Sequence, residues 1–496
     1  MGAFEERRKW FSLAAVNMGN FVPPLDTGIM SLILPTISGS LKVPIELVLW
    51  VPLTSLITTA AFLPIFGRFS DGHGRKRYFL LGLALFAVGA YLSGNSLTIY
   101  ELLGYRVIQS LGGAFILANG RALIADAFPP KERGFALGTH VSVIYIGTTV
   151  GVAITGAIVS VTQAIGWRYV FYASAAIAAL TIPLAILALR ESPRNTQVKS
   201  DWPGALTFAA ALGTGLIALT AYANGLTKLD VYIEYISIPG VFYEYVNADY
   251  SIPVYVVTGL AIVCAVAFVF RERRTSQPLI DFGMFRTNSM FSSTNFSALF
   301  LYTSHYSTLI LLSYYLEVIK GVDPLTAGLL LTVEPLSVTV FSIVGGWIAS
   351  RTGSRDPAIV GLGILAASLL LLGTTSQGSS NYFIAFFLGM LGMGVGIFAP
   401  NNTNANLGSV PPEDRARANG ILGMMRHTGQ SLSLALSTVL IGYYIFSGSP
   451  ALGGHFTPAS YISAMDLNFV IGAVLAIIGA YFAYRGRESW ATHDVA

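Results

Sequence analysis

Charged and sulfur-containing side chains are scarce in this chain. Asp, Glu, Lys and Arg make up 11% of the 496 residues, whereas hydrophobic residues make up 54%. Because soluble domains carry about 25% charged residues, this composition excludes an ordinary soluble surface and places the chain in a lipid bilayer. The single cysteine, Cys264, excludes an intrachain disulfide, and no Cys and His residues have the spacing of a zinc site.

Motifs for enzymatic and ATP-driven chemistry are also missing from the sequence. No nucleophile and base occur together at membrane depth, and no glycine-rich phosphate-binding loop is present. We therefore expect neither an enzyme nor an ATP-driven pump, and we expect no cofactor or metal. The charged EERRK start leads into an apolar run longer than the core of a signal peptide, so the first span is expected to stay in the protein.

Long apolar runs are what the chain has in abundance. A helix needs about 20 mostly apolar residues to cross the hydrocarbon core of a bilayer. Scanning for such runs predicts fourteen spans. They cover residues 10–36, 47–66, 78–95, 98–122, 134–160, 168–189, 204–223, 252–270, 290–316, 325–349, 357–374, 381–403, 418–446 and 461–484.

The distribution of Lys and Arg predicts the orientation of these spans. If the N-terminus is cytoplasmic, most of the 29 Lys and Arg residues fall in cytoplasmic segments, and Lys42, Arg168, Lys228 and Lys320 fall outside. Basic residues favour the cytoplasmic side, so we expect a multi-pass protein of the plasma or inner membrane with both termini in the cytoplasm. The net charge of +4 is then a topology signal and gives no reason to expect nucleic acid.

A charged loop between apolar runs occurs twice in the chain. Residues 67–77 read GRFSDGHGRKR, and residues 346–355 read GWIASRTGSR. A second pair, FPPKERG at 128–134 and VPPEDRA at 410–416, has nearly the same offset of about 280 residues. A repeat of this length indicates two duplicated bundles and argues against a solenoid.

The duplication predicts the domain organisation. Residues 10–190 form one six-span bundle and residues 286–484 form the other. Residues 191–285 are a linker with two extra spans and an extracellular loop. Within that loop, the Tyr-rich segment 228–250 alternates around Pro239-Gly240, which is typical either of a β-hairpin or of a loose loop at the membrane interface.

Three segments resemble the major facilitator superfamily, and in particular its 14-span drug/proton antiporter branch. They are residues 67–77, RVIQSLGG at 106–113 and LDTGIMSLILP at 25–35. The resemblance implies an all-α membrane protein with the major facilitator fold, two six-helix bundles plus two inserted helices. It also implies a monomer that works by alternating access and exports small amphipathic compounds in exchange for protons, as in multidrug efflux.

Two other functions stay open at this stage. The antiporter pattern has a Gly-Pro pair in the fifth span, but here Gly151 is followed by Val152. That departure, together with Arg106 and Arg121 as anion ligands, favours a solute importer or proton symporter of the same fold. A lipid flippase is the remaining alternative.

The loop at 67–77 predicts a gate on the cytoplasmic side. Gly67 and Gly74 permit tight turns and close helix approach, and the basic residues hold the loop at the anionic membrane face. The resemblance implies that Asp71 bonds to the start of the thirteenth span, whereas Ser350 stands at its place in the second copy. The alternative is a basic cluster that sets topology alone. The predicted gate comprises Gly67, Asp71, Gly74, Arg75, Asp126, Arg133, Arg415 and Arg417.

Asp26, Arg106 and Glu334 are the candidates for proton coupling, because ionisable groups inside a membrane are costly and usually functional. Asp26 lies roughly 24 Å along its helix from Trp10, after Pro23-Pro24. Arg106 is its expected counter-charge. The alternatives are a carboxylate at the helix end and a buried structural pair.

The substrate cavity is predicted from depth in the spans. Gln109 lies one helical turn from Arg106, and His305 and Tyr306 lie at the repeat-equivalent depth of Asp26. His305 and Glu334 are equally consistent with structural partners. Arg121 and Arg426 lie toward the cytoplasmic ends of their spans, where a gate or interface role is the simpler interpretation. Pairs of glycines spaced four apart, Gly147 with Gly151 and Gly392 with Gly396, predict close helix packing.

Overall fold

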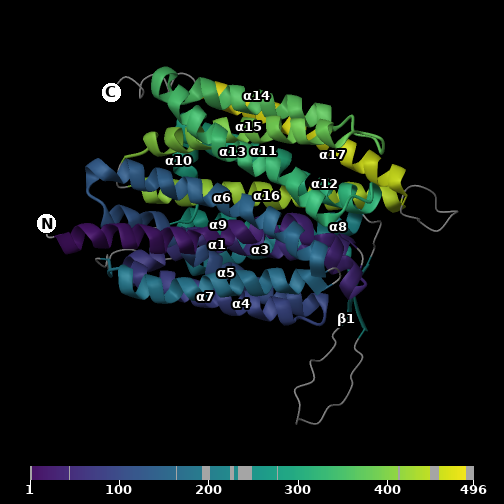
Figure 1. The fold of residues 1–496 in the computed structure, drawn as a ribbon, viewed down its shortest axis with the longest axis horizontal. Helices are drawn as coiled ribbons and strands as arrows, with labels where there is room; N and C mark the ends of the chain where they lie inside the picture. The colour runs from purple at the N-terminus through teal and green to yellow at the C-terminus, as the bar shows by residue number, and fades with distance from the viewer. Residues whose placement is uncertain are drawn as a thin grey trace, which may run out of the picture.

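The fold, taken from a computed structural model, consists of long helices and one short two-stranded ribbon (Figure 1). The structure describes residues 3–43, 45–162, 165–192, 201–223, 228–232, 249–275, 278–411, 414–446 and 457–486. Figure 1 marks both chain ends on the same side of the helices, and the β1 strand extends from the opposite side.

We name α1 to α7 the N-terminal half and α10 to α17 the C-terminal half. The helices of the N-terminal half are α1 (Ala3–Leu41), α2 (Ile45–Val48), α3 (Trp50–His73), α4 (Arg75–Asn95), α5 (Ile99–Ala127), α6 (Pro130–Thr162) and α7 (Gly166–Ala188). Between the halves lie α8 (Trp202–Ala223), β1 (Lys228–Tyr232), β2 (Asp249–Pro253) and α9 (Val254–Arg274).

The C-terminal half contains a π-helical segment, η2, in addition to its α-helices. Its elements are α10 (Phe282–Thr287), α11 (Ser289–His305), α12 (Thr308–Tyr314), η2 (Tyr315–Ile319), α13 (Pro324–Thr352), α14 (Arg355–Leu372), α15 (Asn381–Gly408), α16 (Arg415–Phe446) and α17 (Pro458–Arg485). In Figure 1 the purple and blue helices gather on one side of the molecule and the green and yellow helices on the other.

The predicted all-α membrane fold with fourteen spans is confirmed. Among the described residues, 12 helices are long and apolar enough to cross a membrane. The two further predicted spans also exist as helical structure. Residues 290–316 correspond to α11, α12 and η2, and residues 418–446 correspond to α16.

Short polar motifs start several of these helices where the sequence places them. The Thr98 side chain accepts a hydrogen bond from the backbone N–H of Glu101, and Asp323 accepts one from Thr326 ahead of α13. Both satisfy an N–H that the first turn of a helix leaves unpaired. The first helical residue of α13 is Pro324, which lacks an N–H and so loses no bond there.

The ninth predicted span is not continuous, which the sequence did not indicate. It breaks at Tyr306 and Ser307 between α11 and α12. The backbone N–H of Ser307 donates to Ser433 Oγ at 3.1 Å, and Ser307 Oγ donates to Asn468 Oδ1 at 3.3 Å. Asn468 Nδ2 in turn donates to Ser437 Oγ at 2.9 Å. A break at membrane depth requires such internal partners, because lipid offers none.

Glycines let the helices approach closely at the predicted positions. A Cβ at Gly147 would lie 2.7 Å from the Phe21 carbonyl oxygen, and one at Gly151 would collide with the Leu25 carbonyl. A Cβ on Gly392 or Gly396 would likewise collide with backbone atoms of α13. The predicted close packing at both pairs is therefore confirmed.

The two halves meet through a close glycine contact of their own. Gly156 of α6 faces Gly328 of α13, and a Cβ on Gly156 would lie 3.2 Å from the Gly328 Cα and 2.8 Å from the Pro324 carbonyl oxygen. The helices α3 and α16 form the other main contact between the halves.

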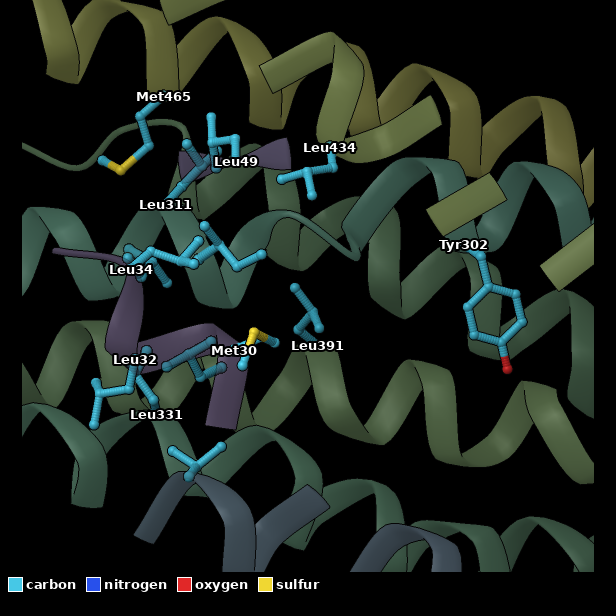
Figure 2. Packing of buried hydrophobic residues seen from close by; sticks show 14 of the residues in the cluster. Met30, Leu32, Leu34, Leu49, Tyr302, Leu311, Leu331, Leu391, Leu434 and Met465 are labelled. Carbon is cyan, nitrogen blue, oxygen red and sulfur yellow. The ribbon is translucent and has the colours of Figure 1, made fainter. Parts of the chain in front are cut away.

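The largest apolar cluster takes side chains from both halves (Figure 2). Met30, Leu32 and Leu34 of α1 belong to it together with Leu331 of α13 and Leu434 of α16. The α1 members lie in the part of the helix that is away from the chain ends. The halves are therefore joined by a dry core on the side opposite the termini.

The two loop copies share a backbone feature. Gly74 ends α3 with φ of 114°, and Gly353 ends α13 with φ of 83°, a region that side chains other than glycine rarely adopt. The predicted turn at Gly74 is confirmed. Gly67 lies within α3, and a Cβ there would meet Ala118 Cβ at an ordinary 3.9 Å, so the predicted turn or close approach at Gly67 is wrong.

The inserted segment contains both predicted features, helices and a ribbon. The α8 helix packs against α9 and also contacts α3 and α16, one from each half. β1 and β2 pair antiparallel, with Lys228 opposite Pro253 and Tyr232 opposite Asp249. The hairpin interpretation of residues 228–250 is confirmed at its ends, and residues 233–248 lie outside the described part of the chain.

Gly151→Val tests the close approach of α1 and α6. A valine side chain would collide with the Leu25 carbonyl, so we expect the free energy of unfolding to fall by about 1–3 kcal/mol. Gly363→Val on α14 is the matched control, because a Cβ there meets nothing within 4 Å. Melting temperatures in detergent measure both effects, and equal temperatures for the two variants would contradict the packing argument.

Candidate functional site

A cavity of about 230 Å³ lies between the two halves. The helices α1, α3, α4, α5 and α6 line it on one side, and α11 and α16 line it on the other. Its polar and aromatic lining includes Asn20, Asp26, Arg106, Gln109, Arg121, His140, Tyr145, Tyr302, Tyr306, Asn419, Arg426, His427 and Gln430.

Asp26, Arg106 and Gln109 form a closed hydrogen-bonded triangle in this cavity. Arg106 Nη1 donates to Asp26 Oδ1 at 2.8 Å and to Gln109 Oε1 at 2.9 Å. Gln109 Nε2 donates to the same Asp26 oxygen at 2.9 Å. The side chains of Arg106 and Asp26 are 1% and 9% exposed, so the pair is almost fully removed from solvent. The structure thus brings together three of the residues that the sequence analysis predicted as site residues.

Local sequence positions this triangle. Arg106 and Gln109 are three residues apart on α5, which places them on one face of the helix. Asp26 follows Pro23 and Pro24, which have no N–H to donate to the helix and line the cavity beside it. The α1 helix nevertheless runs unbroken from Ala3 to Leu41. The guanidinium carbon of Arg106 also lies 5.6 Å from the centroid of the Phe171 ring.

The C-terminal candidates separate into two groups. Tyr306 lies at the break between α11 and α12 and lines the cavity, as predicted from its depth. His305 and Glu334 are not among the residues that line this cavity, and His305 Nε2 lies 4.0 Å from Glu334 Oε1. His305 Nδ1 lies 2.9 Å from the Leu301 carbonyl oxygen. Within the described residues, Glu334 Oε2 is buried without a hydrogen-bond partner.

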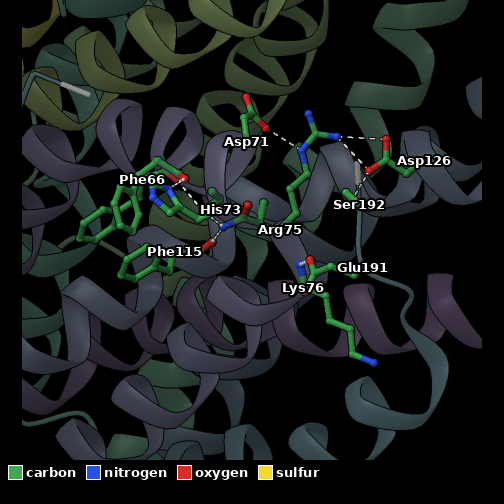
Figure 3. Close-up of polar contacts among 12 residues, drawn as sticks. Phe66, Asp71, His73, Arg75, Lys76, Phe115, Asp126, Glu191 and Ser192 are labelled. Carbon is green, nitrogen blue, oxygen red and sulfur yellow. Dashed lines mark hydrogen bonds and ion pairs between the residues drawn. The ribbon is translucent and has the colours of Figure 1, made fainter. Parts of the chain in front are cut away.

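The loop after α3 holds a network of charges (Figure 3). Arg75 lies between two carboxylates, with its Nε donating to Asp71 Oδ1 at 2.6 Å and its Nη1 donating to Asp126 Oδ2 at 2.9 Å. Ser192 Oγ donates to the same Asp126 oxygen at 2.5 Å. The network joins the start of α4 to the ends of α3 and α5 and to the chain after α7.

A second part of this network surrounds Gly74. Glu191 accepts a hydrogen bond from the backbone N–H of Lys76 at 3.0 Å and lies 3.4 Å from Arg77 Nε. A Cβ on Gly74 would lie 2.7 Å from Glu191 Oε1. Glycine at position 74 is therefore required by its positive φ, and the Glu191 carboxylate packs directly against it.

The predicted partners of Asp71 in the other half make different contacts. Arg417 lies 3.2 Å from Asp281 Oδ2, and it also reaches the Pro278 carbonyl oxygen at 3.5 Å. Arg415 is exposed at the start of α16. Among the contacts of the described residues, Asp71 has Arg75 as its partner, so a latch across the halves stays a prediction. The side chains of Arg133 and Ser350 lie outside the described part.

Several site residues were not predicted. Tyr145 and Tyr302 line the cavity, but tyrosines are common in membrane helices and carried no signal. Glu191 and Ser192 join the loop network; an acidic residue directly after an apolar span, among basic ones, was the signal available.

The sequence and the fold of this chain both resemble those of known proteins. A sequence profile of the Major Facilitator Superfamily matches residues 16–292 and 294–493. The riboflavin transporter RibZ of Clostridioides difficile is 27% identical over 476 residues, which cover 95% of this chain and 96% of that protein. Multidrug resistance protein 3 of Bacillus subtilis is 28% identical over 391 residues, 78% of this chain and 71% of that protein.

Further relatives and solved structures agree. Multidrug resistance protein Stp of Mycobacterium tuberculosis (strain CDC 1551 / Oshkosh) is 28% identical over 448 residues, 90% of this chain and 78% of that protein. A bacterial homologue of the human lysosomal transporter Spinster, crystallised inward-facing and unoccupied, superposes with a TM-score of 0.69 over 98% of both chains at 16% identity. That likeness concerns the fold, while the profile match covers nearly the whole sequence. The chain therefore belongs to the Major Facilitator Superfamily, and it is a multi-pass membrane transporter and not an enzyme.

Proposed function

We propose that this transporter exports small amphipathic compounds by alternating access and that it uses the proton gradient as its energy source. The observation that carries the proposal is the buried triangle of Asp26, Arg106 and Gln109 in the cavity between the halves. Two of the relatives described above are named for multidrug resistance, which supports export of this class of compound.

Asp26 is proposed as the proton carrier. Burying an ionised carboxylate is costly unless a counter-charge accompanies it, and Arg106 supplies that charge at 2.8 Å. When a proton binds Asp26, the pair loses its attraction and Arg106 keeps its own charge. The charged or titratable neighbours of Asp26 are Arg106 on α5 and Tyr306 at the break in the other half. Protonation of Asp26 would therefore change the charge that the other half faces across the cavity.

The arrangement of the halves supports alternating access. The dry core shared by α1, α13 and α16 closes the side opposite the chain ends, while the cavity lies nearer the ends. With both termini placed in the cytoplasm of a cell-membrane protein, this geometry corresponds to an inward-facing state. In the proposed cycle residues 10–190 and 286–484 rock as two bundles about Asp26, with 191–285 as the insertion between them, in a transporter that acts as a monomer.

The charged loop is proposed as a cytoplasmic gate. In the inward-facing state Arg75 is held by Asp71 and Asp126 inside the N-terminal half. When the cytoplasmic side closes and the transporter opens to the outside, Asp71 would leave Arg75 and bind the start of α16, where Arg415 and Arg417 lie. Asp71 would then have different partners in the two states, so its contacts would stabilise one state over the other. Glu334 and His305 are proposed as a second buried acid–base pair behind the cavity.

Asp26→Asn tests proton coupling. The amide cannot carry a proton between the two sides, so we expect pH-gradient-driven transport into proteoliposomes to fall to the rate measured without a gradient. The measurement follows substrate flux together with proton flux in the same vesicles. Transport of substrate from the outer side to the cytoplasmic side would instead favour a solute importer.

The control for this test is Asp323→Asn. Asp323 is the exposed N-cap of α13, and asparagine caps a helix as well as aspartate does, so the same chemical change is made outside the cavity. Gradient-driven transport is expected to stay at the wild-type rate in this variant. Unchanged coupling in Asp26→Asn, or an equal loss in both variants, would contradict the role of Asp26.

Asp126→Asn tests the gate. Partly exposed ion pairs contribute about 0.2–1 kcal/mol, so we expect transport to slow by up to about fivefold without loss of folded protein. Asp356→Asn is the matched control, because Asp356 is 64% exposed and pairs with its neighbour Arg355 at 2.9 Å. Initial rates at saturating substrate measure the effect. The gate assignment fails if the two variants slow transport equally.

A further inference from the structure

A second polar cluster lies in the cavity and is separate from the Asp26 triangle. It consists of Arg121 on α5, Tyr145 on α6, Tyr302 on α11 and Arg426 on α16. Each half thus contributes one arginine and one tyrosine to the cluster. Figure 2 shows Tyr302 standing apart from the aliphatic side chains of the apolar core. The proposed proton-coupling step uses none of these four residues.

The two guanidinium groups of the cluster have few partners. Arg121 Nη1 donates to Asn419 Oδ1 at 2.5 Å, and the Arg426 guanidinium carbon lies 5.2 Å from the Tyr302 ring centroid. In the described part of the chain, Arg426 Nε is buried without a hydrogen-bond partner, and neither arginine forms an ion pair.

Their mutual repulsion makes this arrangement costly. Arg121 and Arg426 line the same cavity, one from each half, and like charges that share a site repel each other. Like charges in a partly dry site are stabilised when an anion lies between them, and guanidinium groups bind carboxylates with two parallel hydrogen bonds. The unpaired Arg426 Nε and the repulsion between like charges therefore both favour the binding of an anion at this cluster.

The charges lining the cavity support this conclusion. The described lining contains three arginines, Arg106, Arg121 and Arg426, and one carboxylate, Asp26. Asp26 is already engaged by Arg106. The remaining field is positive, so it attracts an anion and repels an organic cation.

Aromatic rings define the rest of the ligand. Tyr145, Tyr302, Tyr306 and Phe86 line the same cavity, and such rings pack well against a flat aromatic ligand. The volume of about 230 Å³ is below the roughly 300–1,000 Å³ of pockets for drug-sized ligands, which favours a small compound.

We propose that Arg121 and Arg426 together bind the carboxylate of the transported compound, and that this compound is a small aromatic organic acid. The inference rests on the proposed transport function, whose substrate class it specifies. Because one arginine comes from each half, the bound anion removes the repulsion that opposes their approach. Substrate binding thereby favours closure of the halves on the side of the chain ends.

The test is equilibrium binding to the purified full chain in nanodiscs of neutral lipid, measured by calorimetry at constant pH. Three probes share one ring system: 2-naphthoate, 2-naphthol and 2-naphthylmethylamine. We expect 2-naphthoate to bind most tightly. Arg426→Gln and Arg121→Gln should each weaken that binding about ten- to a hundredfold, the loss typical of a hydrogen bond between charged groups. Arg426→Glu should reverse the preference in favour of the amine, which a merely structural role would not produce.

Arg351→Gln is the matched control. Arg351 stacks on Trp347 at 4.0 Å in the second loop copy, outside the cavity lining, so the variant removes the same charge at a distance from the site. Its binding of 2-naphthoate is expected to equal that of the wild type. The melting temperature of every variant is measured to check that it folds. Where a Gln variant does not fold, the corresponding Lys variant replaces it, and its affinity for 2-naphthoate is expected to be several-fold weaker than that of the wild type.

Several outcomes would overturn the proposal. They are no binding of 2-naphthoate, tighter binding of the amine, unchanged affinity in both cavity arginine variants, or displacement of 2-naphthoate by anionic lipid alone, which would assign the site to a headgroup. The assay contains no pH gradient, so a failure of proton coupling in the Asp26→Asn experiment would leave this result intact, and the two proposals can fail separately.

Discussion

The ion pair between Asp26 and Arg106 is the interaction on which the arrangement of this transporter depends. Removing one partner of a buried pair costs about 3–5 kcal/mol, because the other charge is left without compensation in a dry site. The pair ties α1 to α5 at mid-depth, and Gln109 fixes its geometry with two further hydrogen bonds. Asp26 also lines the cavity between the halves, which is why it is the residue proposed to carry the proton.

Most of the fold and the centre of the site could be predicted from the sequence. Hydropathy gives the spans because a helix must be apolar over the full thickness of the bilayer, and the triangle follows from helical depth and spacing on α1 and α5. The break at Tyr306 and Ser307 could not be predicted, since it depends on Ser433 and Asn468, residues that lie more than a hundred positions away along the chain. The partners of Asp71 and Arg417 depend on the conformational state of the protein, which a sequence does not specify.

In the proposed cycle the two clusters in the cavity have different roles. The Asp26 triangle belongs wholly to the N-terminal half, so the proposed protonation acts first within that half. The arginine and tyrosine cluster has members from both halves, so the proposed binding of an anion acts on their approach. A proton and an organic anion would therefore act on different steps of one cycle, and their coupling would pass through α5, which carries both Arg106 and Arg121.

The position of α8 has a consequence for the route by which cargo reaches the cavity. This helix contacts α3 and α16, and with α9 it contributes Ala205 and Phe268 to an apolar cluster that also contains Ile65 and Met424. The helices α8 and α9 therefore shield the interface between α3 and α16 from the surrounding lipid. The helices α6 and α13 meet where Gly156 faces Gly328, near the end of α6 that is away from the chain ends. A lipid that entered between α3 and α16 would have to displace α8 and α9, so on that side the arrangement favours cargo that enters from the aqueous phase.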